Sequence, residues 1–351
     1  MSDSPAAAVS APTHPRAVLW LIAGTAAWGL SFPVQKMLTM LQQTRVPEAD
    51  SWFLTSWIIC LRSLLAAGLL FLWRPKMLLG MTRNEVAQGL LLGLIGGLGL
   101  ILQADGLAHT QASTSAFLTQ AYCVILPLWH CLSRRIFPDW RIAGSTVLVL
   151  WGISILSGLD WGTMTMGRGE WETLASSLAF TFQIILLERP KYRENRMIPV
   201  TLLMFLGFAL WSAPVAVMAA PRLPDLVTVA AAPKVFVLLS ILAVFCTVFA
   251  YGIMNAWQPH VSATEAGLIY CIEPVCTAVY ALFLPALLSA WTGVAYANET
   301  VTTTLLAGGL LITGANVLTQ WRPQAKPAVA GVIPASGGAG SGERNAGRHP
   351  Q

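Results

Sequence analysis

Two charged side chains, Arg62 and Glu273, lie in the middle of long apolar stretches of the sequence. An ionisable group at the centre of a membrane helix costs about 2.5–3.5 kcal/mol on insertion scales, so such residues mark candidate functional sites. Because a buried ion pair lowers this cost for both partners, we expect Arg62 and Glu273 to meet. Two interpretations stay open. The pair is broken by a substrate or by protonation of Glu273, or it is a permanent bridge that orients two parts of the protein.

Polar side chains accompany Glu273 at helical spacing. Tyr270, Glu273, Thr277 and Tyr280 follow one another at intervals of three and four residues, which places them on one face of a helix. Gln120 begins a similar stripe in an earlier apolar stretch. Such stripes line a cavity or form ordinary hydrogen bonds between helices, worth about 0.6 kcal/mol each. For Gln120 and Tyr270 we expect cavity lining.

An aromatic residue, a lysine and three prolines complete the candidate substrate or proton pathway. Trp28 either packs in the helix bundle or contacts a substrate, and Lys36 lies toward the outer end of the same stretch, where it can snorkel to the interface. Pro33, Pro127 and Pro274 each remove a backbone hydrogen bond, so they predict kinks in their helices. Kinks at matching places suit helices that bend between two states, although static bundles contain them as well.

Sequence motifs for other chemistries are missing. The six cysteines lie within apolar stretches and form no C-x-x-C pair, so we predict no metal site. The sequence has no H-E-x-x-H motif, no G-x-S-x-G motif and no phosphate-binding G-x-x-x-x-G-K-[ST] loop. We therefore predict no catalytic residues, no cofactor and no enzymatic activity.

Ten apolar stretches, each long enough to cross a bilayer, carry these residues. The chain is 55% hydrophobic and 11% charged, whereas soluble domains average about 25% charged residues. A helix needs about 20 apolar residues to cross the hydrocarbon core, where backbone groups must be satisfied within the helix. The sequence thus predicts an all-α membrane protein with ten transmembrane helices at 17–40, 52–73, 85–107, 112–132, 141–158, 171–188, 197–219, 234–257, 262–285 and 303–321.

The basic residues predict the orientation of the chain. Most of the 21 Lys and Arg residues fall in connections on one side of the expected membrane, as the positive-inside rule requires of the cytoplasmic side. Both termini are then cytoplasmic. Residues 1–15 and 323–351 are rich in Ala, Pro, Gly and Ser, which predicts disordered tails. The net charge of +5 indicates contact with the lipid bilayer rather than with nucleic acid.

The two halves of the chain, 17–158 and 171–321, share landmarks. Residues 106–118 read GLAHTQASTSAFL and lead to Pro127, and residues 256–268 read AWQPHVSATEAGL and lead to Pro274. Five helices per half make the second half enter the membrane from the opposite side. We therefore predict two inverted five-helix repeats, a plan that secondary transporters use around a substrate site near the midplane.

The motifs also resemble a known family, the EamA-type transporters of the drug/metabolite transporter superfamily. The matching segments are A-A-W-G-L-S-F at 26–32, L-R-S-L-L-A-A at 61–67, F-L-T-Q-A-Y-C-V-I-L-P at 117–127, I-E-P-V at 272–275, N-E-T at 298–300 and G-G-L-L-I-T-G-A-N at 308–316. The resemblance covers about residues 17–321. It implies a basket of ten helices that exports small metabolites or amino acids, usually across a bacterial inner membrane.

Two features depart from the family pattern. Arg135 stands about where many relatives carry Glu before the fifth span, while Glu299 fills the matching place before the tenth. The segment from Pro274 to Glu299 is also unusually long, and its residues 285–299 predict an extended ninth helix followed by an interfacial or re-entrant segment. Trp291 and Tyr296 are expected in the headgroup layer.

The function that fits these patterns is secondary transport of a small organic solute by alternating access, in the direction of efflux. Glu273 makes coupling to protons plausible. The alternative is a membrane scaffold or sensor that transports nothing. The sequence leaves the substrate, the coupling ion and the oligomeric state open.

Overall fold

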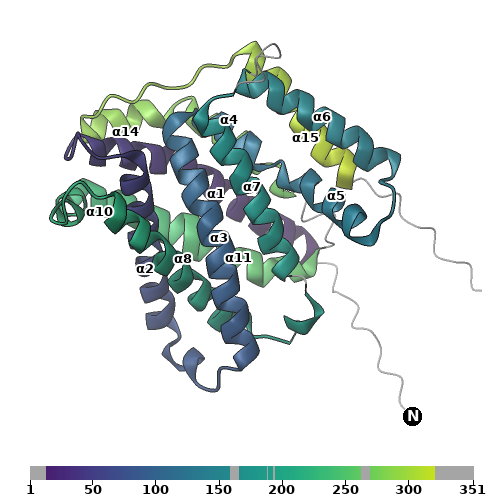
Figure 1. Ribbon diagram of the computed structural model, residues 1–351, viewed down its shortest axis with the longest axis horizontal. Helices are drawn as coiled ribbons and strands as arrows, with labels where there is room; N and C mark the ends of the chain where they lie inside the picture. Colours follow the sequence, from purple (N-terminus) through teal and green to yellow (C-terminus); the bar gives the residue numbers. More distant parts are fainter. Residues whose placement is uncertain (1–12, 159–165, 188, 193, 262–268, 321–351) are drawn as a thin grey trace, which may run out of the picture. The chain divides into compact units, whose positions relative to one another are not determined.

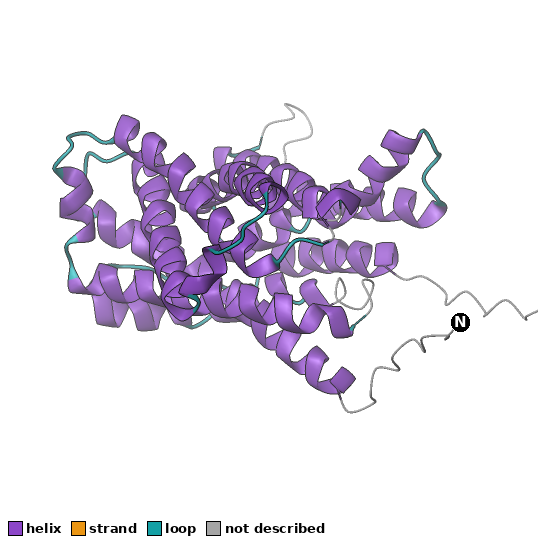
Figure 2. Cartoon of the chain, turned by 90° about the horizontal axis from the view of Figure 1, so that it is seen from below, coloured by secondary structure: helices purple, strands orange, loops and turns teal. Residues whose placement is uncertain are grey.

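A computed structural model describes residues 13–158, 166–187, 189–192, 194–261 and 269–320 of the chain. Within these ranges the protein is entirely helical and has no strand, which confirms the predicted all-α class (Figures 1 and 2). The α-helices are α1 (Thr13–Gln43), α2 (Ser51–Trp73), α3 (Arg83–His109), α4 (Ala112–Thr119), α5 (Tyr122–Arg134), α6 (Trp140–Ser157), α7 (Arg168–Leu187), α8 (Met197–Ala219), α9 (Asp225–Ala230), α10 (Pro233–Ala243), α11 (Ala250–Trp257), α13 (Glu273–Ala281), α14 (Leu284–Thr292) and α15 (Thr303–Gln320). The shorter turns of helix are η1 (Pro75–Leu78), η2 (Pro190–Tyr192), η3 (Val244–Phe249) and η4 (Gln258–His260).

Six helical segments of the described chain are long and apolar enough to cross a membrane: His14–Gln43, Ser51–Trp73, Arg83–His109, Ala112–Arg134, Met197–Ala219 and Pro233–Met254. A seventh is added if α13 and α14, which are bent by 52° relative to each other, form one broken span. The helices α6 and α15 are apolar but shorter, and α7 is helical without meeting the same criterion. The structure thus supports a multi-pass membrane protein, while the number of ten spans stays a prediction.

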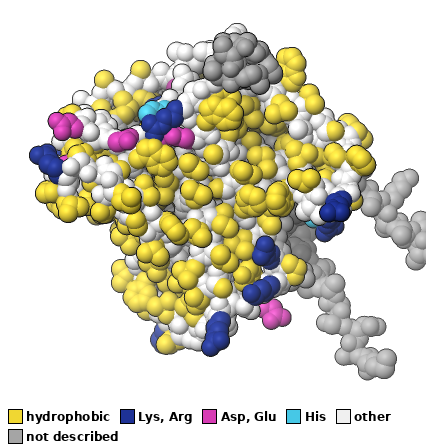
Figure 3. Space-filling model, viewed as in Figure 1, with side chains coloured by type: hydrophobic (Ala, Val, Ile, Leu, Met, Phe, Trp, Pro, Cys, Tyr) yellow, Lys and Arg dark blue, Asp and Glu magenta, His cyan; other side chains and the backbone are white. Residues whose placement is uncertain are grey.

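The exterior has the composition that lipid contact requires. Figure 3 shows hydrophobic side chains over much of the visible face, with the charged side chains in a few small groups. Leu72, Trp140 and Met218 are among the large apolar side chains that project outward. Soluble monomers rarely expose contiguous apolar patches of this kind, because water penalises them.

Helix ends follow the local sequence. Thr82 and Glu85 form a capping box at the start of α3, in which each side chain accepts a hydrogen bond from the other residue's backbone N–H. The Asp139 side chain caps α6 by accepting from the N–H of Arg141 at 2.5 Å. Gly158 ends α6 and Gly293 ends α14 with φ of 61° and 81°, a left-handed conformation that glycine adopts without strain.

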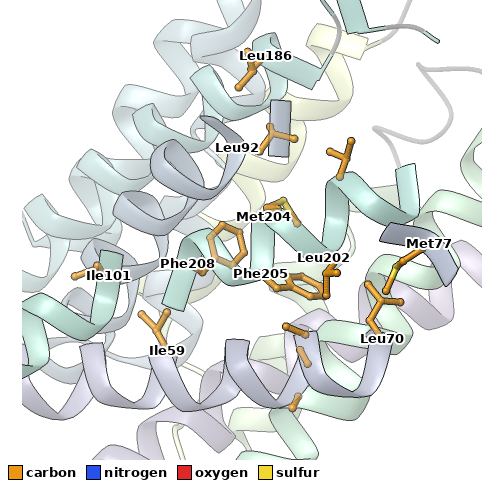
Figure 4. Packing of buried hydrophobic residues seen from close by; sticks show 14 of the residues in the cluster. Ile59, Leu70, Met77, Leu92, Ile101, Leu186, Leu202, Met204, Phe205 and Phe208 are labelled. Carbon is orange, nitrogen blue, oxygen red and sulfur yellow. The ribbon is translucent and has the colours of Figure 1, made fainter. Parts of the chain in front are cut away.

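The centre of the bundle is α3, which packs against α7 on one side and α8 on another, while α2 also packs on α8. Figure 4 shows the apolar core between them, where Phe205 and Phe208 of α8 lie near Ile59 of α2 and Leu92 of α3. Gly89, Gly93 and Gly97 recur at every fourth residue of α3 and face α8, so the two helices can approach closely. At Gly93 an added Cβ would lie 2.7 Å from the Cα of Gly207.

The fourth and ninth predicted spans are interrupted, but Pro33 and Pro127 lie inside continuous helices. The helix α1 runs unbroken through Pro33. The fourth predicted span is interrupted at residues 120–121, between α4 and α5, so the break precedes Pro127 by about two turns. In the ninth predicted span the chain turns at residues 271–272, directly before Glu273 and Pro274 at the start of α13. A π-helical turn, η3, joins α10 to α11.

The segment after α13 corrects one prediction. The helix α14 continues the ninth predicted span at an angle, as an extended and broken helix would, and Trp291 is exposed. Tyr296 does not lie at an exposed interface, because only 8% of its surface is accessible and it packs in a cluster with Met37 and Leu238. Ser289 holds this position, since its hydroxyl both accepts from the N–H of Tyr296 and donates to its carbonyl.

Candidate functional site

The guanidinium of Arg62 is held by neutral groups. Its Nε donates to Thr247 Oγ1 at 2.7 Å, its Nη1 to Gln35 Oε1 at 3.2 Å, and its Nη2 to the carbonyl of Cys246 at 3.4 Å. Only 9% of the residue is exposed. The π-helical turn supplies two of these acceptors, because its wider hydrogen-bond spacing presents the Cys246 carbonyl and the Thr247 hydroxyl to α2.

The predicted ion pair between Arg62 and Glu273 is wrong for this conformation. Arg62 has three acceptors on α1 and η3, and Glu273 accepts instead from Gln120. Tyr251 follows the π-helical turn that binds Arg62, and its ring contacts Trp28, which also contacts the ring of Tyr270. Arg62 and Glu273 therefore share one neighbourhood without forming an ion pair. Sequence reasoning missed Gln35, Thr247 and Tyr251, although polar residues inside apolar spans were a usable signal for the first two.

The two interrupted helices meet at Gln120. This residue ends α4, and its Nε2 donates at 3.3 Å both to the carbonyl of Tyr270 and to Glu273 Oε2. The Tyr270 carbonyl needs this donor, because Pro274 stands four residues later and has no N–H to offer it. Gln120 is only 1% exposed, and its amide N–H groups are used by these two bonds. Tyr270 and Glu273 are partly accessible.

Aromatic rings surround this junction. Trp28 of α1 makes edge contacts with Tyr251 at 5.3 Å and with Tyr270 at 5.8 Å between ring centroids. Tyr251 makes a further edge contact with Phe205 of α8. The structure thus brings together four of the predicted residues, namely Trp28, Gln120, Tyr270 and Glu273.

Two other predicted residues have different surroundings. Lys36 donates to the carbonyl of Thr110, in the connection between α3 and α4. Near it, Glu299 caps the first turn of α4, since its carboxylate accepts from the N–H of Ala112 at 2.7 Å and from the hydroxyl of Ser113. Lys36 therefore ties down a helix connection at one end of the bundle, and it does not join the cluster around Glu273.

Thr277 is fully buried where α1 crosses α13. Its hydroxyl lies 3.1 Å from the carbonyl of Gly29 and 3.1 Å from that of Glu273, and can donate to either. Pro33 lacks the N–H that would normally bond the Gly29 carbonyl, so Thr277 replaces the missing donor. Gly29 permits the approach, because an added Cβ would lie 3.0 Å from the carbonyl oxygen of Glu273.

We expect Thr277→Val to lower the free energy of unfolding by about 1 kcal/mol, because it leaves the buried Gly29 carbonyl unpaired. The loss should shrink in a Pro33→Ala background, where the new N–H can bond that carbonyl within α1. Thermal or denaturant unfolding of the purified protein measures both. Thr39→Val is the control, since Thr39 bonds the Gln35 carbonyl within an intact helix. Equal losses in both backgrounds would contradict this role of Thr277.

The chemistry available at the junction is that of binding. An amide, a phenol and an indole lie around the Glu273 carboxylate. Among the described residues, no group of three or more His, Cys, Asp and Glu side chains could hold a metal ion. Rings and a few convergent polar groups are the usual lining of a site for a small organic molecule.

The N-terminal part of the chain is similar to a known protein family. Residues 15–158 match the model of the EamA-like transporter family. An uncharacterized transporter from Archaeoglobus fulgidus is 26% identical over 193 residues, which are 54% of this chain and 58% of that protein. A solved crystal structure superposes with a TM-score of 0.50 over 84% of this chain and 95% of the other, at 13% identity, and so supports the fold alone.

Proposed function

Because residues 15–158 match the model of the EamA-like transporter family, we propose that the protein is a secondary transporter of a small organic solute. It works by alternating access between two sides of a membrane. In the proposed architecture, ten transmembrane helices form two inverted five-helix repeats, 17–158 and 171–321. The Lys and Arg distribution favours cytoplasmic termini, and the family resemblance favours a bacterial inner membrane and efflux.

The pattern of helix packing supports the inverted repeats. If the helices are numbered by predicted span, exchanging the halves maps α2 onto α8, α4 onto α13 and α6 onto α15, and each of these pairs is in contact. The packing of α3 on α7 maps onto that of α10, η3 and α11 on α1. The packing of α3 on α8 likewise maps onto that of α10 on α2. Contacts that survive this exchange are what a pseudo-twofold axis predicts.

The observation that carries the proposal is the junction at Gln120. Two predicted spans in equivalent places of the halves are both interrupted, and the interruptions meet through the bonds from Gln120 to Tyr270 and Glu273. Transporters with inverted repeats place substrate and ion sites at interrupted helices near the midplane, where freed backbone groups and side chains become ligands. Glu273 and the accessible rings of Trp28 and Tyr270 are the proposed substrate contacts, with Glu273 also the proposed proton carrier.

Reconstitution into liposomes tests the proposal directly. We expect saturable flux of a small solute, measured with a panel of labelled amino acids and aromatic or cationic metabolites, and faster flux when a pH gradient is imposed. Protein-free liposomes are the control for leakage. Absence of saturable flux for the whole panel, in protein that is folded and correctly inserted, would contradict transport and favour the scaffold.

A further inference from the structure

A second cluster of ionisable groups joins α3 to α7, away from the Gln120 junction. Asp105 lies in the last turns of α3 and is completely buried. Arg168, the first residue of α7, donates to Asp105 Oδ2 at 2.5 Å and to Glu172 Oε1 at 2.8 Å. Two carboxyl groups therefore share one guanidinium at the contact between the two helices.

The second oxygen of each carboxyl group has no hydrogen-bond donor among the described residues. Asp105 Oδ1 and Glu172 Oε2 are both buried, and no donor among the described residues reaches either atom. Arg168 bonds both carboxyl groups, so the two side chains lie side by side at this crossing. Ionised carboxylates only accept hydrogen bonds, so two of them cannot bond directly. One proton bound between them supplies the missing donor, because it turns one carboxyl group into a donor for the other and allows a charge-assisted O–H···O⁻ bond.

The charges around the pair agree with one bound proton. With the proton in place, the single negative charge of the pair balances Arg168. Without it, a buried net negative charge would remain, which is costly in a low-dielectric interior. His109 lies 4.0 Å from Asp105 Oδ2, but its Nε2 also lies 3.0 Å from the Ser51 hydroxyl. The Arg168 guanidinium lies over the ring of Trp52.

Other charged groups nearby are engaged elsewhere. Glu170 accepts from the hydroxyl of Thr110 at 2.6 Å, and Lys36 donates to the Thr110 carbonyl. Glu299 caps α4, and Asp50 caps α2. Among the residues that the structure describes, Arg168 of α7 and His109 of α3 are thus the ionisable groups that face the pair directly, and α2 contributes Ser51 and Trp52.

We propose that Asp105 and Glu172 form a proton-binding site that clamps α3 to α7. The two helices are as close as backbones allow beside it, since an added Cβ at Gly106 would lie 2.7 Å from the Gly169 carbonyl oxygen. Loss of the proton sets two carboxylates against each other at this crossing. In the topology proposed above the site lies near the outer side, so external acid would favour the clamped arrangement.

Infrared spectroscopy of the purified full-length protein tests the bound proton without any transport measurement. At neutral pH we expect Glu172→Gln and Asp105→Asn each to lose one protonated-carboxyl C=O band relative to the wild type. Glu170→Gln is the matched control, an acid-to-amide change two residues away, and should keep the band. An identical band in the wild type and in both pair variants would overturn the proposal.

The pH dependence of thermal stability is the second readout. The folded protein holds a proton that the unfolded chain releases near pH 4, so wild-type stability should fall as the pH rises above about 4. In Glu172→Gln the amide N–H can donate permanently to Asp105 Oδ1, so this part of the pH dependence should vanish. A melting profile that Glu172→Gln leaves unchanged would contradict a shared proton. Neither readout measures flux. The shared proton can therefore be disproved while the proposed transport function holds, and transport can be disproved while the shared proton holds.

Discussion

Replacement of Gly93 by valine is expected to lower the free energy of unfolding by about 3 kcal/mol, the upper end of the usual range for overpacked cores. The first atom of the new side chain would lie 2.7 Å from the Cα of Gly207 and 3.1 Å from the carbonyl oxygen of Met204. Both obstacles belong to the backbone of α8, so no side-chain rotation relieves them. The helices α3 and α8 must move apart, and the core around Phe205 and Phe208 loses its packing.

Thermal unfolding in detergent, with the yield of monodisperse protein as a second measure, checks this result. Gly68→Ala is the control, because no heavy atom lies within 4 Å of an added Cβ there and the position faces outward on α2. It should leave stability unchanged or raise it slightly through helix propensity. Gly207→Val should act like Gly93→Val, since it enters the same crossing from the other helix. A Gly93→Val protein with wild-type stability would mean that the two helices do not cross here.

Much of the fold was predictable because membrane helices obey strong rules. The apolar stretches predicted the helices, whereas the close approach of Gly93 to Gly207 is identified by the structure. The polar character of Gln120, Tyr270 and Glu273 inside apolar helices marked them as candidate site residues, and the structure adds that Gln120 bonds the other two. These predictions rest on local features, namely length, period and residue size.

The unpredicted features depend on how particular turns are wound and on which helix ends meet. The partner of Arg62 could not be found from spacing, because a π-helical turn places Thr247 and the Cys246 carbonyl where a regular α-helix would place other atoms. The sequence patterns assigned no specific partner to Arg168. Its bonds to Asp105 and Glu172 appear once α3 and α7 are packed together.

Replacement of Glu273 by glutamine is expected to reduce transport at least about tenfold while the protein stays folded. Glutamine has nearly the shape of glutamate and can keep the bond to Gln120, which lies 3.3 Å away. It cannot carry a proton or a negative charge, so among the described residues around the Gln120 junction it removes the one acidic group. If Glu273 exchanges a proton during the cycle, this loss stops or uncouples the flux, because the charge no longer changes between the two states.

Flux into liposomes at several pH values, combined with thermal unfolding of the same preparations, measures this effect. Glu48→Gln supplies the matched control, since Glu48 is exposed at the end of the bundle and should give wild-type flux.

Comparison with Glu172→Gln separates the two acidic sites. Loss of flux confined to Glu273→Gln places the transported proton at the helix junction. A shifted pH profile with retained flux in Glu172→Gln would assign the α3–α7 clamp to regulation. Wild-type flux and pH dependence in Glu273→Gln would exclude this carboxylate from the transport mechanism.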